Sequence, residues 1–134
     1  MAKRILIIDD DPDVILFLAT ILQDHGYQTM EAQNGLEGLE MVNSKNPDLV
    51  LLDLMMPQKS GISFLREMKS NEHLKKVPVI MVTGIAGETG IDLGSFLKRN
   101  VGIGKDGKPL SPEGYIEKPV DPDKLITLMK ELLE

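Results

Sequence analysis

The chain has 134 residues, a length that suits one domain able to bury most of its surface on folding. Hydrophobic residues make up 42% and charged residues 27%, as in an ordinary soluble globular protein. The net charge of −6 argues against direct binding of nucleic acid, which needs a basic face. The lack of Cys excludes disulfides, thiolate metal sites and a cysteine nucleophile, and the two distant histidines, His25 and His73, do not suggest a metal site.

The sequence also lacks the pattern of a targeting or membrane segment. The basic start at residues 1–4 is followed by only four apolar residues, too few for the apolar core of a signal peptide. No apolar run is long enough to cross a membrane. We therefore expect a cytoplasmic protein that does not bind membranes.

The first part of the chain predicts two strands with a helix between them. Residues 4–8 form an apolar run that predicts a strand. Asp11 followed by Pro12 predicts a helix that begins with a capping carboxylate and a proline in its first turn, and this helix extends to about Asp24. Residues 27–32 predict a second strand.

The middle of the chain continues the alternation. Asn34 is placed to cap a second helix, in which Leu36, Leu39 and Val42 share one face. The apolar run at residues 49–52 then predicts a third strand.

The remaining elements follow the same order. A third helix is marked by Ile62, Leu65 and Met68, and strands are predicted at residues 79–82 and 115–117. A last helix, after a second Asp-Pro pair, has one apolar face made of Leu125, Leu128, Met129, Leu132 and Leu133.

One segment departs from this alternation. Residues 84–114 hold eight of the twelve glycines in the chain, and a weak helical pattern is followed by a candidate hairpin turn at Asp106–Gly107. We expect an irregular insertion at about residues 85–113, either a small hairpin or a mobile loop.

Alternating strands and helices predict a doubly wound α/β domain, in which helices cover both faces of a parallel sheet. Ligands of such sheets bind outside the carboxyl ends of the strands. Polar residues follow the predicted strands at this edge: Asp9, Asp10, Asp53, Thr83 and Lys118. We therefore expect these side chains to form one site.

The chemistry of this set indicates phosphoryl transfer with a divalent cation. Asp10 and Asp53 can supply the carboxylates that Mg²⁺ prefers, and Asp9 can bind it directly or through a water. A carboxylate can also act as the nucleophile of phosphoryl transfer, and Asp53 is the candidate. Lys118 can hold a phosphate oxygen, and the Thr83 hydroxyl can donate a hydrogen bond to another.

Four segments of the chain resemble the receiver domains of bacterial two-component response regulators. They are residues 5–12, residues 49–57 with Gly61, residues 78–83 and residues 115–119. The resemblance implies a single receiver domain over residues 1–134, with a flavodoxin-like five-stranded parallel sheet in the order 2-1-3-4-5. The gap between Thr83 and Lys118 is longer than is usual in this family.

The resemblance also implies a role for each site residue. Asp53 would accept a phosphoryl group from the phosphohistidine of a histidine kinase or phosphotransfer protein. Asp9, Asp10 and Asp53 would bind Mg²⁺, together with the backbone carbonyl of Met55. The chain would be a phosphoacceptor that catalyses only its own phosphorylation and dephosphorylation, and an output protein or domain would be a second partner.

Further roles follow at the end of the last strand. Thr83 and Lys118 would contact the phosphoryl group, and Tyr115 would change rotamer with the state of the switch. The peptide bond before Pro119 would be cis, a geometry that only proline makes inexpensive.

Other interpretations remain open at this point. Each residue alone has a structural explanation: a solvated turn for Asp9 to Asp11, an acceptor of loop amides for Asp53, a strand end for Thr83, a surface lysine for Lys118, and a core aromatic for Tyr115. The chain could also be a degenerate receiver that acts as a phosphorylation-independent protein-interaction module.

Two further classes fit less well. A phosphatase with an aspartyl nucleophile usually has a second acid two residues later, where this chain has Met55. A flavodoxin-like electron carrier would have a Ser/Thr/Gly loop after the first strand, where this chain has three aspartates.

Overall fold

The computed structural model describes residues 2–53, 61–83 and 110–133. Met55 and nearly all of the expected insertion at about residues 85–113 lie outside these ranges. The elements in chain order are β1 (Arg4–Ile8), α1 (Pro12–Asp24), β2 (Gln28–Ala32), α2 (Gly35–Lys45), β3 (Leu49–Asp53), α3 (Gly61–Ser70), β4 (Val79–Thr83), β5 (Gly114–Glu117) and α6 (Pro122–Leu133).

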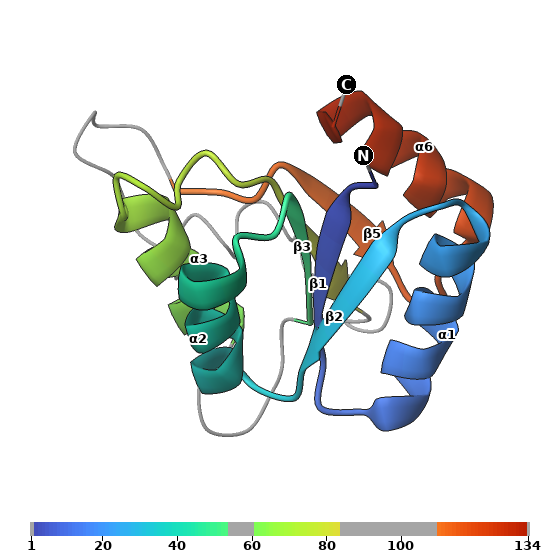
Figure 1. Cartoon of the computed structure of the whole chain (residues 1–134), viewed down its shortest axis with the longest axis horizontal. Coiled ribbons are helices and arrows are strands. Elements are labelled where there is room, and N and C mark those ends of the chain that lie inside the picture. Colours follow the sequence, from blue (N-terminus) through green and yellow to red (C-terminus); the bar gives the residue numbers. More distant parts are fainter. Residues whose placement is uncertain (1, 54–60, 84–109, 134) are drawn as a thin grey trace.

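The strands form one parallel sheet between two layers of helices (Figure 1). The strand order is β2-β1-β3-β4-β5, and every neighbouring pair is parallel, so the predicted topology is confirmed. Helices α1 and α6 cover one face, and α2 and α3 cover the other. All carboxyl ends of the strands therefore lie at the same edge of the sheet.

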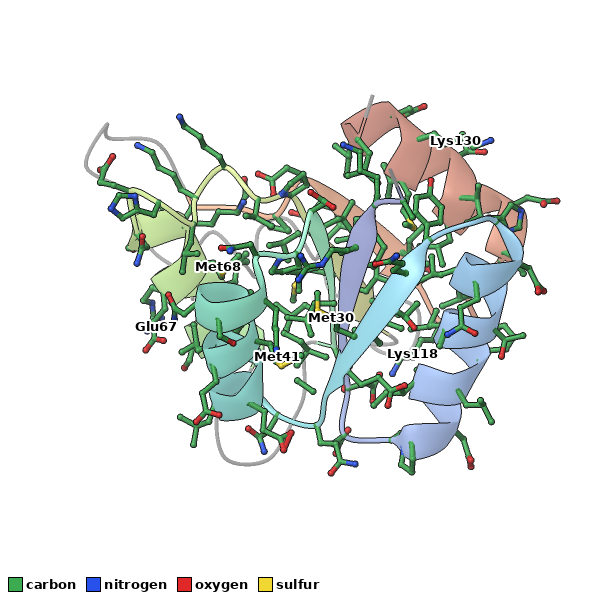
Figure 2. The ribbon with its side chains drawn as sticks, in the orientation of Figure 1. Met30, Met41, Glu67, Met68, Lys118 and Lys130 are labelled. Carbon is green, nitrogen blue, oxygen red and sulfur yellow. The ribbon has the colours of Figure 1, made fainter. Side chains whose placement is uncertain are left out.

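Each face of the sheet has its own apolar core, and strand alternation assigns residues to them. In β1, Ile5 and Ile7 pack in the core beneath α1 and α6, whereas Leu6 and Ile8 pack in the core beneath α2 and α3. Because all four side chains are almost fully buried, each contributes roughly 1.5–3 kcal/mol of transfer free energy. This two-sided burial explains the uninterrupted apolar runs in the sequence. Figure 2 labels Met68, which belongs to the core beneath α2 and α3, and Met30 and Met41, which pack against that core.

Side-chain caps fix where the first two helices begin. The Asp11 carboxylate accepts a hydrogen bond from the Asp13 amide at 2.9 Å, as predicted. In α2, Asn34 accepts from the Glu37 amide at 2.9 Å, and the Glu37 carboxylate accepts from the Gln33 amide at 2.7 Å. This arrangement resembles a capping box, except that Glu37 bonds the amide of the residue before the cap. Both helices therefore start just beyond the carboxyl edge of the sheet.

Helix α2 packs differently from its prediction. Leu36 is 50% exposed, so its placement on one buried face with Leu39 and Val42 was wrong. The helix instead approaches the sheet through Gly38, where an added Cβ would lie 2.5 Å from Cδ1 of Ile8. Because Gly38 has no side chain, α2 can lie close to the sheet at this residue. The helix therefore buries Gly38 and leaves Leu36 exposed.

Helix α6 confirms its predicted apolar face. Leu125, Ile126 and Met129 are buried, and Leu128 packs against them with partial exposure. Among the described residues, no helix combines the length and apolar character that crossing a membrane requires.

Candidate functional site

Strand alternation brings three predicted site residues to one face of the sheet. Asp9 follows Ile7 by two residues, and Asp53 follows Leu51 by two residues. Lys118 follows Ile116 in the same way, and all three apolar residues pack in the core beneath α1 and α6. Because side chains of a strand alternate between faces, both carboxylates and the ammonium group continue that face at the strand ends or one residue beyond them.

The distances show that these residues form a cluster. Carboxylate oxygens of Asp9, Asp10 and Asp53 all lie within 4.8 Å of one another. The Nζ atom of Lys118 lies 3.4 Å from Oδ2 of Asp9 and 3.5 Å from Oδ1 of Asp53. Figure 2 shows Lys118 at the edge of the sheet where β1 leads into α1. The structure thus brings together four of the five charged or hydroxyl residues predicted for the site.

Burial differs sharply within the cluster. Asp9 is 2% exposed and Asp53 is 8% exposed, whereas Asp10 is exposed to solvent. The two buried carboxylates lie beside a partly buried lysine, and the third carboxylate of the cluster is open to solvent. A ligand can approach from the side of Asp10.

Burial raises the pKa of Asp9 above its ordinary value of 3.8, because desolvation penalises the charged carboxylate. Three contacts oppose this effect: the amide of Asp11 donates to Oδ1 at 2.9 Å, and Lys118 both attracts the carboxylate and donates to it. The neighbouring charge of Asp10 adds to the increase in pKa. The structure therefore holds Asp9 in a position where its negative charge is costly.

The donor set fits a small divalent cation. Three carboxylates within 4.8 Å offer only oxygen atoms, the ligands that Mg²⁺ prefers. A cation among them would relieve the repulsion between Asp9, Asp10 and Asp53. Lys118 supplies a positive charge of its own beside the buried pair, Asp9 and Asp53.

The remaining predicted residues have different outcomes. Thr83 is the last residue of β4 and is opposite Glu117 of β5, but its side chain and all of Met55 lie outside the described part of the chain. Tyr115 is 40% exposed, which contradicts the alternative of a core aromatic. The bond between Lys118 and Pro119 is cis, the geometry that the resemblance implies.

Sequence reasoning missed a further buried charged residue, which lies at the opposite edge of the sheet from Asp9 and Asp53. Lys69 is 9% exposed at the end of α3, and its Nζ atom lies 2.7 Å from Oε1 of Glu113. One signal was available, because Lys69 occupies the apolar face of α3 marked by Ile62 and Leu65. Its partner lies 44 residues later in the sequence, so the pair could not be assigned from spacing.

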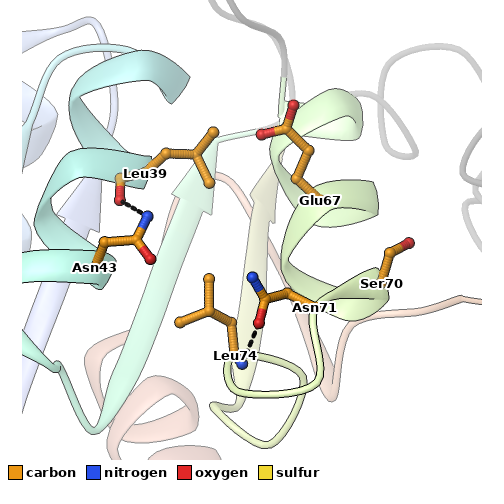
Figure 3. Close-up of a pocket in the computed structure, with 6 residues that line it drawn as sticks. All are labelled: Leu39, Asn43, Glu67, Ser70, Asn71 and Leu74. Carbon is orange, nitrogen blue, oxygen red and sulfur yellow. Dashed lines mark hydrogen bonds between the residues drawn. The ribbon is translucent and has the colours of Figure 1, made fainter.

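A hollow of about 410 Å³ between α2 and α3 is a separate feature (Figure 3). It is lined by Leu39, Asn43, Glu67, Ser70, Asn71 and Leu74. Its two asparagine side chains already have local partners, since Asn43 donates to the carbonyl of Leu39 and Asn71 accepts from the amide of Leu74. The hollow contains none of the predicted site residues, and it lies toward the ends of both helices, away from Asp53.

Comparisons with known proteins agree with this geometry. The response regulator receiver domain matches residues 5–96. Protein PilH of Pseudomonas aeruginosa is 32% identical over 130 residues, which cover 97% of this chain and 97% of PilH. The phosphate regulon transcriptional regulatory protein PhoB of the same organism is 32% identical over 133 residues, which cover 99% of this chain but 52% of PhoB.

Solved structures give the same result. A response regulator receiver domain protein (CheY-like) from Methanospirillum hungatei is 30% identical and superposes with a TM-score of 0.78. The superposition covers 99% of this chain and 94% of that protein. The likeness therefore extends over the whole sheet, including β5, the strand that Lys118 follows.

Proposed function

Because the chain belongs to the family of response regulator receiver domains, we propose that it is a phosphorylatable switch of a two-component phosphorelay. Receiver domains are phosphoacceptor switches and not ordinary enzymes. Asp53 accepts a phosphoryl group from the phosphohistidine of a histidine kinase or phosphotransfer protein. The main support is the cluster of Asp9, Asp10 and Asp53, two of which, Asp9 and Asp53, also lie beside the Nζ atom of Lys118.

In this proposal Asp10 and Asp53 hold Mg²⁺, with Asp9 binding directly or through a water and the backbone carbonyl of Met55 completing the protein ligands. When bound, the ion offsets the negative charge that carboxylates and a phosphoryl group bring together. The fit rests on three carboxylates within 4.8 Å of one another.

Asp53 performs the chemical step as a nucleophile. One carboxylate oxygen attacks phosphorus, and the new O–P bond forms as the P–N bond to the donor histidine breaks. The electron pair of that bond stays on the imidazole nitrogen, which takes up a proton. Lys118 holds one phosphoryl oxygen, since its Nζ atom already lies 3.5 Å from Oδ1 of Asp53, and the Thr83 hydroxyl donates to another.

The same proposal includes the state change that follows. Tyr115 on β5 responds to the phosphoryl group and alters the surface presented to an output protein or domain. The chain later catalyses hydrolysis of its own aspartyl phosphate. A cytoplasmic location is part of this proposal.

Phosphorylation by a small-molecule donor tests the function directly. The chain is incubated with acetyl phosphate and Mg²⁺, and its intact mass is measured. We expect one phosphoryl group on the wild type, none on Asp53→Ala, and none when EDTA removes the cation. Asp13→Asn is the matched control, because Asp13 is an exposed carboxylate in the first turn of α1, outside the cluster. A wild type that gains no phosphoryl group would overturn the proposal and favour the phosphorylation-independent interaction module.

A further inference from the structure

The buried Lys69 ammonium group joins three parts of the chain at the amino edge of the sheet. It donates to the backbone carbonyl of Lys75 at 3.1 Å and to that of Val77 at 2.9 Å. Both carbonyls belong to the connection between α3 and β4. Its third partner is Oε1 of Glu113, at 2.7 Å. Each of the three ammonium hydrogens therefore has an acceptor.

Glu113 carries this contact into the sheet. The same Oε1 atom accepts a hydrogen bond from the amide of Val79 at 2.8 Å, and the amide of Glu113 donates to the carbonyl of Val79 at 2.9 Å. Val79 is the first residue of β4, and Glu113 directly precedes β5. The carboxylate thus fixes the point at which β5 begins to pair with β4.

The pairing of β5 needs such a fixed point. The strand has only four residues, and within the described residues it pairs with β4 alone. A slip of one residue would turn every side chain of a strand to the opposite face. Lys118 follows β5 immediately, so a slip would carry its ammonium group away from Asp9 and Asp53.

A second contact marks the same register. Gly114 lies against α6, where an added Cβ would be 2.8 Å from Cδ2 of Leu128. A slip would place either Glu113 or Tyr115 at this position, and the side chain of Leu128 would then have to shift. The start of β5 is therefore held by the ion pair of Glu113 with Lys69, by its hydrogen bonds to Val79 of β4, and by close packing of Gly114 against α6.

We propose that Lys69 and Glu113 are positioning residues that fix the register of β5 and thereby place Lys118 between Asp9 and Asp53. As a role in phosphoryl transfer, this positioning rests on the function proposed above. The pair acts from the opposite edge of the sheet and does not touch the phosphoryl group.

A double-mutant cycle in the full chain separates positioning from simple destabilisation. The rate constant for phosphorylation by acetyl phosphate and Mg²⁺ is measured for Glu113→Ala, for Lys118→Ala and for the double variant. We expect Glu113→Ala to slow the reaction about tenfold when Lys118 is present, because small misplacements of a catalytic group cost this much or more. In the Lys118→Ala background, the same change should have no further effect. An equal slowing in both backgrounds, or no slowing in either, would overturn the proposal.

Milder variants keep the test decisive if Glu113→Ala does not fold. Glu113→Gln retains an oxygen for the Val79 amide but removes the charge beside Lys69, so a smaller slowing is expected. Lys69→Arg, which keeps a cation, should react faster than Lys69→Met. Lys75→Met is the matched control, because within the described ranges the side chain of Lys75 pairs with Glu72 alone, at an exposed position, and the variant should react like the wild type.

A measurement without phosphorylation distinguishes the two proposals. Contacts between β4 and β5 are followed by NMR through nuclear Overhauser effects between Val82 and Ile116, which are paired in the register. These effects should weaken in Glu113→Ala and persist in Lys75→Met. If they weaken while the wild type accepts no phosphoryl group, the positioning role stands and the proposed function fails. Unchanged effects in Glu113→Ala would overturn the positioning role.

Discussion

Two lysines at opposite edges of one sheet have contrasting surroundings. At the amino edge, the side chain of Lys69 is 6% exposed and is held by Glu113 at 2.7 Å and by two backbone carbonyls. At the carboxyl edge, the side chain of Lys118 is 31% exposed and lies 3.4–3.5 Å from Asp9 and Asp53. The first lysine is fully coordinated by the protein, and the second is shared loosely between two carboxylates.

The contrast shows how one fold separates a structural charge from a reactive charge. A buried ion pair with short, fully satisfied contacts resists rearrangement, because removal of either partner leaves a charge or a carbonyl without its acceptor or donor. A longer, partly hydrated pair can exchange one oxygen ligand for another at small cost. Lys118 is therefore suited to accept a phosphoryl oxygen, whereas Lys69 is suited to hold strands in place.

Among the variants in this comparison, we expect Lys69→Met to change the free energy of unfolding most. The change leaves the carbonyls of Lys75 and Val77 without their charged donor and removes the partner of Glu113. We expect the free energy of unfolding to fall by about 3 kcal/mol, as measured by urea denaturation.

Lys75→Met is again the control, since it breaks only an exposed pair with Glu72 and should cost less than about 0.5 kcal/mol. If both variants lost the same small amount, Lys69 would contribute no more than a surface lysine, and the contrast between the two edges would disappear.

The sequence predicts the carboxyl edge well for a physical reason. Asp9, Asp53 and Lys118 each follow an apolar run, and parallel strands bring the ends of such runs together whatever their distance along the chain. Most element boundaries follow from the same apolar runs and from the capping residues of α1 and α2, whereas the strand order was implied by the resemblance to receiver domains.

The amino edge is harder to predict because its contacts have no local pattern. Glu113 follows Lys69 by 44 residues in the sequence, so no periodicity connects them. The error at Leu36 has a related cause. Apolar spacing identifies one face of a helix, but it does not show that a different face, the one with Gly38, can pack more closely against the sheet. Both features depend on how elements pack and not on where each element begins.

For Asp9→Asn we expect a smaller change in stability, and an increase where Lys69→Met causes a loss. The folded pKa of Asp9 is raised by burial above 3.8, so the folded state binds the proton more tightly than the unfolded state. Its contribution to stability is therefore complete below about pH 3.8 and is lost as the pH rises through the raised folded pKa.

Asparagine removes this penalty and can still accept the hydrogen bond from the amide of Asp11. Without divalent cations, we expect Asp9→Asn to be more stable than the wild type at neutral pH by about 1 kcal/mol, with the difference shrinking in acid. Denaturation at several pH values measures it, with Asp13→Asn as the control. A variant less stable than the wild type at neutral pH would mean that the contact with Lys118 outweighs the cost of burial.

The smallest effect on stability is expected for Lys118→Met, the same substitution as at Lys69. The lost attraction to Asp9 and Asp53 is weak, because the contacts are longer than 3.3 Å and about a third of the Lys118 side chain is hydrated. We expect a loss of about 0.5 kcal/mol at neutral pH, measured by urea denaturation. The loss should fade in acid as Asp9 becomes protonated. Phosphorylation by acetyl phosphate should nevertheless slow at least about tenfold, because a preorganised cation beside the transferring group is lost. A stability loss as large as that of Lys69→Met would contradict the contrast, since the lysine at the reactive edge would then be held as firmly as the structural one and could not exchange a carboxylate oxygen for a phosphoryl oxygen.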